Sequence, residues 1–303
     1  MEDPVRFRPE LGHTIESGAK ADSRLCWTCG SCDSECPVNI ATGRLRPRNI
    51  VRMASLGMLE ELLCHSEIWY CLTCRRCEQI CPNAVKPSAI IEYLRMEMIS
   101  REWISWETFQ RYRDLFARFQ RVRWRAAAAC LGGDVADVTQ HRWQRWLEDP
   151  LPVFSEKIIS GNVIHAFNTY RGPMERAHIR LCFTCGECSS ACPIACHRDV
   201  FDPRTVFRMA HLGLEEELFR SPALWLCLGC GRCTDACTQT VDGCEIIQSL
   251  RAEAIESGAV DRDLVFRIEA SNRNIFPWFL EEVDRLLGHS TKPAAGCLRR
   301  AYA

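Results

Sequence analysis

Apolar residues recur along this chain at the three- and four-residue spacing of helices that pack one face against a core. In the first half the pattern passes through Ile50, Met53, Leu56, Leu59 and Leu62. No stretch of useful length alternates apolar and polar residues in the manner of a half-buried strand, so strands should be scarce. The pattern therefore predicts a mostly α-helical fold.

Local signals place the ends of several helices. Asp202 followed by Pro203 is typical of an N-cap and the first helical position, where the missing proline N–H costs nothing. Pro47 holds the same place earlier in the chain, without a good capping residue before it. Asp242 and Glu245 have the spacing of a capping box, which predicts a further helix start.

The chain repeats itself with an offset of 156 residues. Residues 46–63, RPRNIVRMASLGMLEELL, align with residues 202–219, DPRTVFRMAHLGLEEELF, without insertion or deletion. Gly57 and Gly213 occupy the same place in the two copies and are expected to break each segment into two short helices. The chain is therefore an internal duplication.

The extent of the repeat suggests a domain organisation. The repeated unit runs from about residue 22 to 101 and again from about 178 to 257. We expect two tandem modules of similar structure, one in a domain of residues 1–150 that includes a connector and one in a domain of residues 151–303.

Composition narrows the classes of protein that remain. The chain has 303 residues, 47% of them hydrophobic, so it can bury a core without covalent staples. Its 38 basic and 39 acidic residues give a net charge of −1, which creates no field that favours nucleic acid. No signal peptide is evident, nor an apolar run of about 18 residues that would span a membrane. We expect a protein of the reducing cytoplasm, peripheral to the membrane only through partners.

Cysteine is the unusual feature, at 21 residues. Sixteen of them form four runs with the spacing C-x2-C-x2-C-x3-C, and these runs begin at Cys26, Cys71, Cys182 and Cys227. Three runs continue with proline. This is the spacing with which bacterial ferredoxins hold a [4Fe–4S] cluster. Structural zinc sites use paired C-x2-C knuckles instead, and disulfide frameworks are typical of short secreted chains.

Each run is expected to form an irregular loop, because cysteines at i, i+3 and i+6 would drift around a regular helix. In two-cluster proteins with this spacing the fourth cysteine of each run binds the neighbouring cluster. That resemblance implies four ligand sets: Cys26, Cys29, Cys32 and Cys81; Cys71, Cys74, Cys77 and Cys36; Cys182, Cys185, Cys188 and Cys237; Cys227, Cys230, Cys233 and Cys192. Sixteen ligands at four per cluster predict four [4Fe–4S] clusters.

Two such runs joined by a helical stretch resemble the α-helical ferredoxin module found in the C subunit of heterodisulfide reductase. The resemblance is carried by residues 26–37 with 71–82, and by residues 182–193 with 227–237. That C subunit normally has one such module, whereas this chain has two. The related iron–sulfur subunits of succinate dehydrogenase and of anaerobic glycerol-3-phosphate dehydrogenase add a plant-type ferredoxin domain or Cys-Cys-Gly domains, and neither pattern occurs in this sequence.

The resemblance implies an electron-transfer subunit of a heterodisulfide reductase-like oxidoreductase complex. Single electrons would pass through four clusters, from a flavin or iron–sulfur donor subunit to a catalytic subunit of the Cys-Cys-Gly type. The sequence shows no paired carboxylates, Ser-His-Asp set or P-loop, so we expect no substrate site in this chain. The alternatives are a subunit of a respiratory, quinone-linked dehydrogenase and a free ferredoxin-like carrier.

Five cysteines lie outside the runs: Cys64, Cys130, Cys196, Cys244 and Cys297. The simplest interpretation is that they are small buried hydrophobes. The alternative is that Cys196 or Cys244 is a spare ligand in the second module. His197 and His211 are expected at surface or capping positions, because the thiolate sets are complete. Thr238, which replaces the proline of the fourth run, is either a tolerated substitution or a hydroxyl near a cluster sulfur.

Two segments and two tryptophans are further candidates. Residues 103–125 combine arginines with aromatic residues, which predicts a basic amphipathic helix. It either packs on its own domain with a solvated arginine face, or docks an acidic partner or a membrane surface. The apolar segment 275–287 is a second candidate interface. Trp69 and Trp225 precede the second run of each copy, and either exclude water from a cluster or pack in the core.

Overall fold

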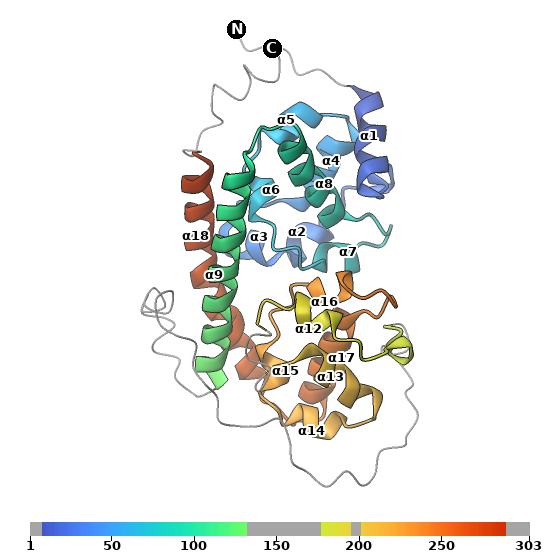
Figure 1. Ribbon diagram of the computed structural model, residues 1–303, viewed down its shortest axis with the longest axis vertical. Coiled ribbons are helices and arrows are strands. Elements are labelled where there is room, and N and C mark those ends of the chain that lie inside the picture. Colours follow the sequence, from blue (N-terminus) through green and yellow to red (C-terminus); the bar gives the residue numbers. More distant parts are fainter. Residues whose placement is uncertain (1–7, 132–176, 195–200, 289–303) are drawn as a thin grey trace. The chain divides into compact units, whose positions relative to one another are not determined.

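The computed structural model describes residues 8–131, 177–194 and 201–288, and every regular element in them is a helix. This confirms the predicted mostly α-helical fold (Figure 1). The first repeat and its flanks form α1 (Pro9–Ala19), η1 (Ser23–Leu25), α2 (Ser31–Glu35), α3 (Pro37–Thr42), α4 (Pro47–Ser55), α5 (Leu59–Leu63), α6 (Glu67–Tyr70), α7 (Arg76–Gln79) and α8 (Pro87–Ser100). The second repeat forms η3 (Ile179–Leu181), α12 (Glu187–Ala191), α13 (Pro203–His211), α14 (Glu215–Phe219), α15 (Ala223–Leu226), α16 (Arg232–Asp235) and α17 (Gly243–Glu256).

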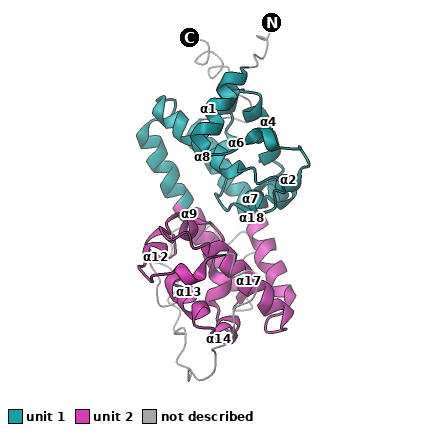
Figure 2. Ribbon diagram, turned by 90° about the vertical axis from the view of Figure 1, so that its right-hand side faces the viewer, with its two compact units in different colours: residues 1–116, 275–303 teal, residues 117–274 magenta. Residues whose placement is uncertain are grey.

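Two long helices follow the repeats, α9 (Trp106–Leu131) and α18 (Arg262–Leu287). The chain divides into two compact units, residues 1–116 with 275–303 and residues 117–274 (Figure 2). Each unit contains one cysteine-rich repeat, and both α9 and α18 contribute residues to both units. A domain boundary near residue 150 lies outside the described residues and stays a prediction.

One helix organises each core. In the first unit α8 packs against α1, α4, α5 and α6, and Ile15, Ile90 and Leu94 are fully buried there. In the second unit α17, the equivalent helix of the repeat, packs against α13, α14, α15 and α16, with Ile246 and Leu250 fully buried. The duplication seen in the sequence is thus a duplication of helical packing.

The predicted helix boundaries are confirmed. The Asp202 carboxylate accepts the Thr205 N–H at 3.2 Å at the start of α13, and Asp242 accepts the Glu245 N–H at 3.1 Å at the start of α17. α4 ends before Gly57, whose φ is 70°, and α5 begins after it. A Cβ at Gly57 would lie 1.8 Å from the Arg8 carbonyl oxygen, so this turn requires glycine.

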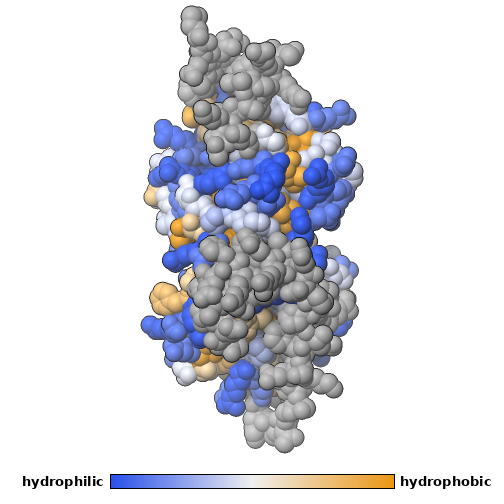
Figure 3. Space-filling model, turned by 90° about the vertical axis from the view of Figure 1, so that its left-hand side faces the viewer, coloured by the Kyte–Doolittle hydropathy of each residue, from blue (hydrophilic) through white to orange (hydrophobic). Residues whose placement is uncertain are grey.

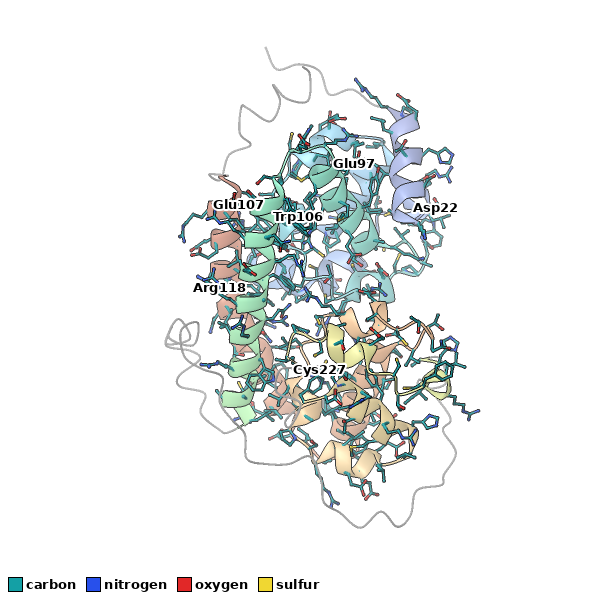
Figure 4. All side chains as sticks on the ribbon, viewed as in Figure 1. Asp22, Glu97, Trp106, Glu107, Arg118 and Cys227 are labelled. Atoms are coloured by element: carbon teal, nitrogen blue, oxygen red, sulfur yellow. The ribbon has the colours of Figure 1, made fainter. Side chains whose placement is uncertain are left out.

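Most of the arginine–aromatic segment lies in α9, where Trp106 is exposed and four later aromatic residues are turned inward. Tyr112, Phe116, Phe119 and Trp124 are buried. The exposed arginines are Arg111, Arg113, Arg118 and Arg121, and Figure 4 marks Arg118 on this helix. Arg123 and Arg125 are buried, so the helix is not a simple two-faced one. The interpretation that it packs on its own domain is the one that the structure supports.

The segment 275–287 lies in α18, and its main apolar side chains are buried rather than available to a partner. Ile275, Phe279, Leu280 and Val283 are fully buried in the first unit, and the Phe279 ring lies 6.0 Å from that of Phe116 on α9. The prediction of an apolar interface here is therefore wrong, since the segment completes the core of its own unit. Across the described residues, no helix combines the length and the apolar character needed to cross a membrane.

Candidate metal centres

The four cysteine runs share one backbone conformation. In each run the residues on either side of the second cysteine are left-handed, with φ between 54° and 94°. These pairs are Thr28 and Gly30, Thr73 and Arg75, Thr184 and Gly186, and Gly229 and Gly231. Alternation of right- and left-handed residues turns successive backbone N–H groups toward one concave side, where they bind anions. The prediction of an irregular loop is confirmed, because the left-handed residues prevent a regular helix.

Backbone donors reach the first sulfur of every run. The N–H two residues after the first cysteine donates to its Sγ at 3.4 Å in all four copies. Side chains act similarly at Cys29, where hydrogen bonds from the Ser31 hydroxyl and backbone lower the pKa of the exposed thiol. Donors aimed at sulfur favour the thiolate, which is the form that binds metal.

Short helices bring the two runs of each repeat together. The third cysteine of every run lies within a one-turn helix, which is α2, α7, α12 or α16. In the first unit α2 packs against α7, and in the second α12 packs against α16. Each unit therefore has two cysteine loops placed opposite one another.

In the first unit the fourth cysteine of one run lies beside the other run. Burial raises the pKa of Cys36 to about 12, and the charges of the nearby Cys71 and Cys74 add to the rise. The end of the second run is in turn joined to the start of the first run. Asn83, two residues after Cys81, donates its Nδ2 to the carbonyl oxygen of Leu25, the residue before the first run, at 2.7 Å. The fourth cysteine of each run thus lies near the other run, as it must if it binds the cluster of that other run.

In the second unit five cysteines line one cavity, and four of them belong to the runs. Cys192 from the third run lies there with Cys227, Cys230 and Cys233 of the fourth run. Burial and the nearby thiolates, that of Cys192 included, raise the pKa of Cys233. Apolar side chains such as Phe207 complete the wall, and Figure 4 marks Cys227 in this unit.

The donor set of this cavity fits an iron–sulfur cluster. Soft thiolate ligands in an apolar pocket are typical of such sites. Among the described residues, three or more cysteine, histidine or acidic side chains do not converge closely enough to hold a single metal ion. A cubane binds one thiolate at each of its four irons, so its ligands stand further apart than those of one ion.

The two runs of the first unit differ in exposure. Cys29 is exposed, whereas Cys71 and Cys77 of the second run are buried. Cys185, the counterpart of Cys29 in the second unit, is exposed as well. The neighbours of these exposed cysteines, Trp27 and Phe183, are exposed as well. In the coloured part of the face drawn in Figure 3, apolar patches lie among hydrophilic residues.

Two arginines in the site were missed by the sequence analysis. Arg95 on α8 and Arg251 on α17 each donate to the carbonyl oxygen of the first cysteine of a second run, at 2.7 Å to Cys71 and 2.6 Å to Cys227. The signal was available in the alignment of the repeat, because Arg95 and Arg251 are offset by 156 residues. An arginine at the same position of the core helix in both repeats indicates a role common to the two units.

The tryptophans before the second runs are core residues. Trp69 is fully buried and its Nε1 donates to the Met98 sulfur at 3.3 Å, while Trp225 is 4% exposed. Each ring lies under the guanidinium of Arg95 or Arg251, at 5.5 and 5.6 Å. Packing in the core is confirmed, and exclusion of water from a cluster stays a prediction.

The remaining candidates have separate outcomes. Cys130 and Cys244 are buried as expected, and Cys244 also lines the cavity of the second unit. Cys64 is half-buried at the end of α5 and is disulfide-bonded, so it is not a buried free thiol. His211 lies in the last turn of α13, and Thr238 is exposed. Cys196, His197 and Cys297 lie outside the described residues.

A scan of protein families identifies the two cysteine-rich segments. Residues 19–85 and residues 178–241 each match the model of the 4Fe-4S dicluster domain. Both segments are thus similar to this iron–sulfur domain, in agreement with the two tandem modules predicted from the repeat.

Curated relatives are more specific. The chain is 40% identical over 85 residues to the C2 iron–sulfur subunit of the CoB–CoM heterodisulfide reductase of Methanocaldococcus jannaschii, a match that covers 28% of this chain and 42% of the relative. It is 32% identical over 91 residues to the C subunit of the H2:CoB-CoM heterodisulfide,ferredoxin reductase of Methanothermobacter thermautotrophicus, covering 29% and 47%. The chain is thus an internal duplication that is similar to the C subunits of heterodisulfide reductases, and it spans about half the length of the curated relatives it matches.

Proposed function

We propose that this chain is an electron-transfer subunit that relays single electrons through four [4Fe–4S] clusters. The observation that carries the proposal is the pair of opposed cysteine loops in each unit, present in two copies. Two cysteine loops per unit, each with the backbone of a cluster-binding run, correspond to two clusters per unit. The cluster supplies one-electron redox chemistry when bound, and the protein supplies position, burial and hydrogen bonds.

The proposed ligand sets follow the exchange of fourth cysteines. In the first unit Cys26, Cys29, Cys32 and Cys81 form one set, and Cys71, Cys74, Cys77 and Cys36 form the other. In the second unit the sets are Cys182, Cys185, Cys188 and Cys237, and Cys227, Cys230, Cys233 and Cys192. The surroundings of Cys36 and the cavity that contains Cys192 support this assignment.

The assembly that we propose is a heterodisulfide reductase-like complex in a reducing cytoplasm. The relatives are named as C subunits of heterodisulfide reductases, and a protein so named has partner chains. A flavin or iron–sulfur subunit would donate electrons, and a Cys-Cys-Gly-type subunit would receive them for catalysis. The exposed Cys29 and Cys185 support entry and exit of electrons near the surface.

Anaerobic purification of the full chain tests the proposal. We expect sixteen iron and sixteen sulfide per chain, and an EPR signal from reduced [4Fe–4S] clusters that integrates to several spins. Co-purification from the native source should yield a flavoprotein and a Cys-Cys-Gly protein. A monomer that exchanges electrons equally with many unrelated donors would support a free carrier instead, and quinone reductase activity of the purified complex would support a respiratory dehydrogenase.

A further inference from the structure

One arginine in each unit donates two hydrogen bonds to the backbone where the second cysteine run begins. Arg95 Nε donates to the Ile68 carbonyl oxygen at 2.7 Å, and its Nη2 donates to the Cys71 carbonyl oxygen at 2.7 Å. Arg251 makes the same pair of bonds, at 2.9 Å to Leu224 and 2.6 Å to Cys227. The contact is therefore duplicated atom for atom between the repeats.

These bonds serve a local need of the chain. α6 and α15 end immediately before the second run, and the last carbonyl groups of a helix have no partner within it. The planar guanidinium offers several N–H donors in a fixed arrangement, so one side chain satisfies two carbonyl groups. The first cysteine is thereby held at the point where the helix turns into the cluster loop.

The position also places a positive charge inside the protein. Arg95 is buried to all but 9% of its surface, and its guanidinium lies over the rings of Trp69 and Tyr112 at 5.5 Å each. In such surroundings charges interact more strongly than in water, since the effective dielectric constant is lower.

An arginine near the first run of the same unit serves as a contrast. Arg48 lies beside the first run, because a Cβ on Gly30 would meet its Nη1 at 3.2 Å, yet its side chain is 39% exposed and its Nε pairs with Asp33 at 3.3 Å. Water and the carboxylate screen this charge. The two runs of the unit thus differ in how strongly an arginine acts on them.

We propose that Arg95 and Arg251 are positioning residues that fix the first ligand of the second run and raise the reduction potential of the cluster bound there. This inference rests on the proposed ligand sets. When a donor protein gives up one electron, the site that accepts it becomes one unit more negative. The guanidinium, which is buried in Arg95 and half-buried in Arg251, stabilises that added charge, so it biases the electron toward the second-run cluster of each unit.

Variants of the full chain, purified without oxygen, test the inference by EPR-monitored redox titration. Arg251→Gln removes the charge, and we expect the midpoint potential of one cluster to fall while the other midpoints stay unchanged. Arg251→Lys keeps the charge but cannot make both hydrogen bonds of the guanidinium. The midpoint potential of this cluster should therefore remain near that of the wild type, and the iron content should be lower. Arg95→Gln and Arg95→Lys should reproduce both results on a different cluster, and Arg48→Gln, the matched control, should leave all midpoints in place.

The outcomes separate this inference from the proposed function. A wild-type chain without [4Fe–4S] clusters would refute the proposed function itself. An Arg251→Gln chain with full iron content and unchanged midpoints would overturn only the role of the arginine. If the glutamine variants bind no clusters, the lysine variants provide the test. A midpoint potential of the lysine variant well below that of the wild type would show that the charge does not set the potential.

Discussion

The backbone N–H of Arg48 donates to the Asp33 carboxylate at 2.9 Å, so a residue of α2 caps the first turn of α4. In the second unit a carboxylate at a different position of the repeat has this role. Asp202 is itself the N-cap of α13, and Ser189, which is the counterpart of Asp33 in the repeat, donates its hydroxyl to Asp202. Both units therefore join the first cysteine run to the next helix through one carboxylate, supplied from opposite sides.

This arrangement predicts a loss of stability when the carboxylate is removed. Asp202→Ala should lower the free energy of unfolding by roughly 1–3 kcal/mol, because the helix loses its cap and the buried Ser189 hydroxyl loses its acceptor. Asp33→Ala should act in the same direction. Urea unfolding of the cluster-loaded chain, followed by circular dichroism, measures both. The control is Asp22→Ala, since Asp22 is 44% exposed, and equal unfolding midpoints for Asp202→Ala and wild type would contradict the prediction.

The exchange of carboxylates shows what the sequence alone could and could not predict. Helix starts at Asp202 and Asp242 follow from contacts within a few residues, and local rules predict these correctly. The cap of α4 comes from Asp33, fifteen positions before Arg48, and no local rule identifies it. Non-local contacts of this kind depend on the packing of α2 against α4.

The candidate site divides in the same way. The cysteine spacing predicts which residues face a cluster, because the chemistry of thiolates and the geometry of a short loop are both local. Two other features depend on tertiary structure, namely the burial of the segment 275–287 and the hydrogen bond from Arg95 to the Cys71 carbonyl oxygen. An apolar stretch has the same sequence pattern whether a partner or its own core covers it, which is why the predicted interface was wrong.

The exchange of fourth ligands makes a specific spectroscopic prediction. Cys36→Ser should remove the same EPR signal and iron as Cys74→Ser, because both residues are assigned to one cluster. Cys29→Ser should remove a different signal, together with Cys81→Ser. Spectra of the four variants, each reduced without oxygen, provide the measurement. A Cys36→Ser spectrum that matches Cys29→Ser would mean that each run binds its own cluster with all four cysteines.

A variant of Cys244 distinguishes a spare ligand from a buried thiol. Cys244 lines the cavity of the second unit, whereas its counterpart in the repeat, Ser88, donates its hydroxyl to Glu78. Because four cysteines complete the proposed set, Cys244→Ser should leave the iron and sulfide content unchanged. Iron analysis of this variant beside Cys233→Ser, which should lose about a quarter of the iron, measures the difference. A loss in Cys244→Ser equal to that in Cys233→Ser would make Cys244 a ligand.

Cluster loading should depend on pH in a predictable direction. Burial raises the pKa of Cys32 and of Cys71 to about 11 each, and that of Cys36 to about 12, so these thiols hold their protons at neutral pH in the cluster-free chain. Ligation requires thiolates and releases those protons, so loading should increase from pH 7 to pH 9 and acid should favour loss of iron. Absorbance of the reconstituted chain measures this, and equal loading at both pH values would contradict it.

Exposed aromatic residues next to the surface runs predict where electrons leave or enter. Trp27 is 75% exposed and Phe183, its counterpart in the repeat, is 70% exposed, and each directly follows the first cysteine of its run. A single exposed ring needs no explanation, but the same position exposed in both copies favours a contact for a redox partner.

Trp27→Ser and Phe183→Ser should slow electron exchange with a partner protein several-fold and leave iron content and midpoint potentials unchanged. Stopped-flow oxidation by the partner and by a small dye separates docking from chemistry, since the dye needs no docking surface. Trp106→Ser, which removes an aromatic ring that is 60% exposed on α9, is the control, and a loss of rate in that variant as large as in Trp27→Ser would argue against docking beside the runs.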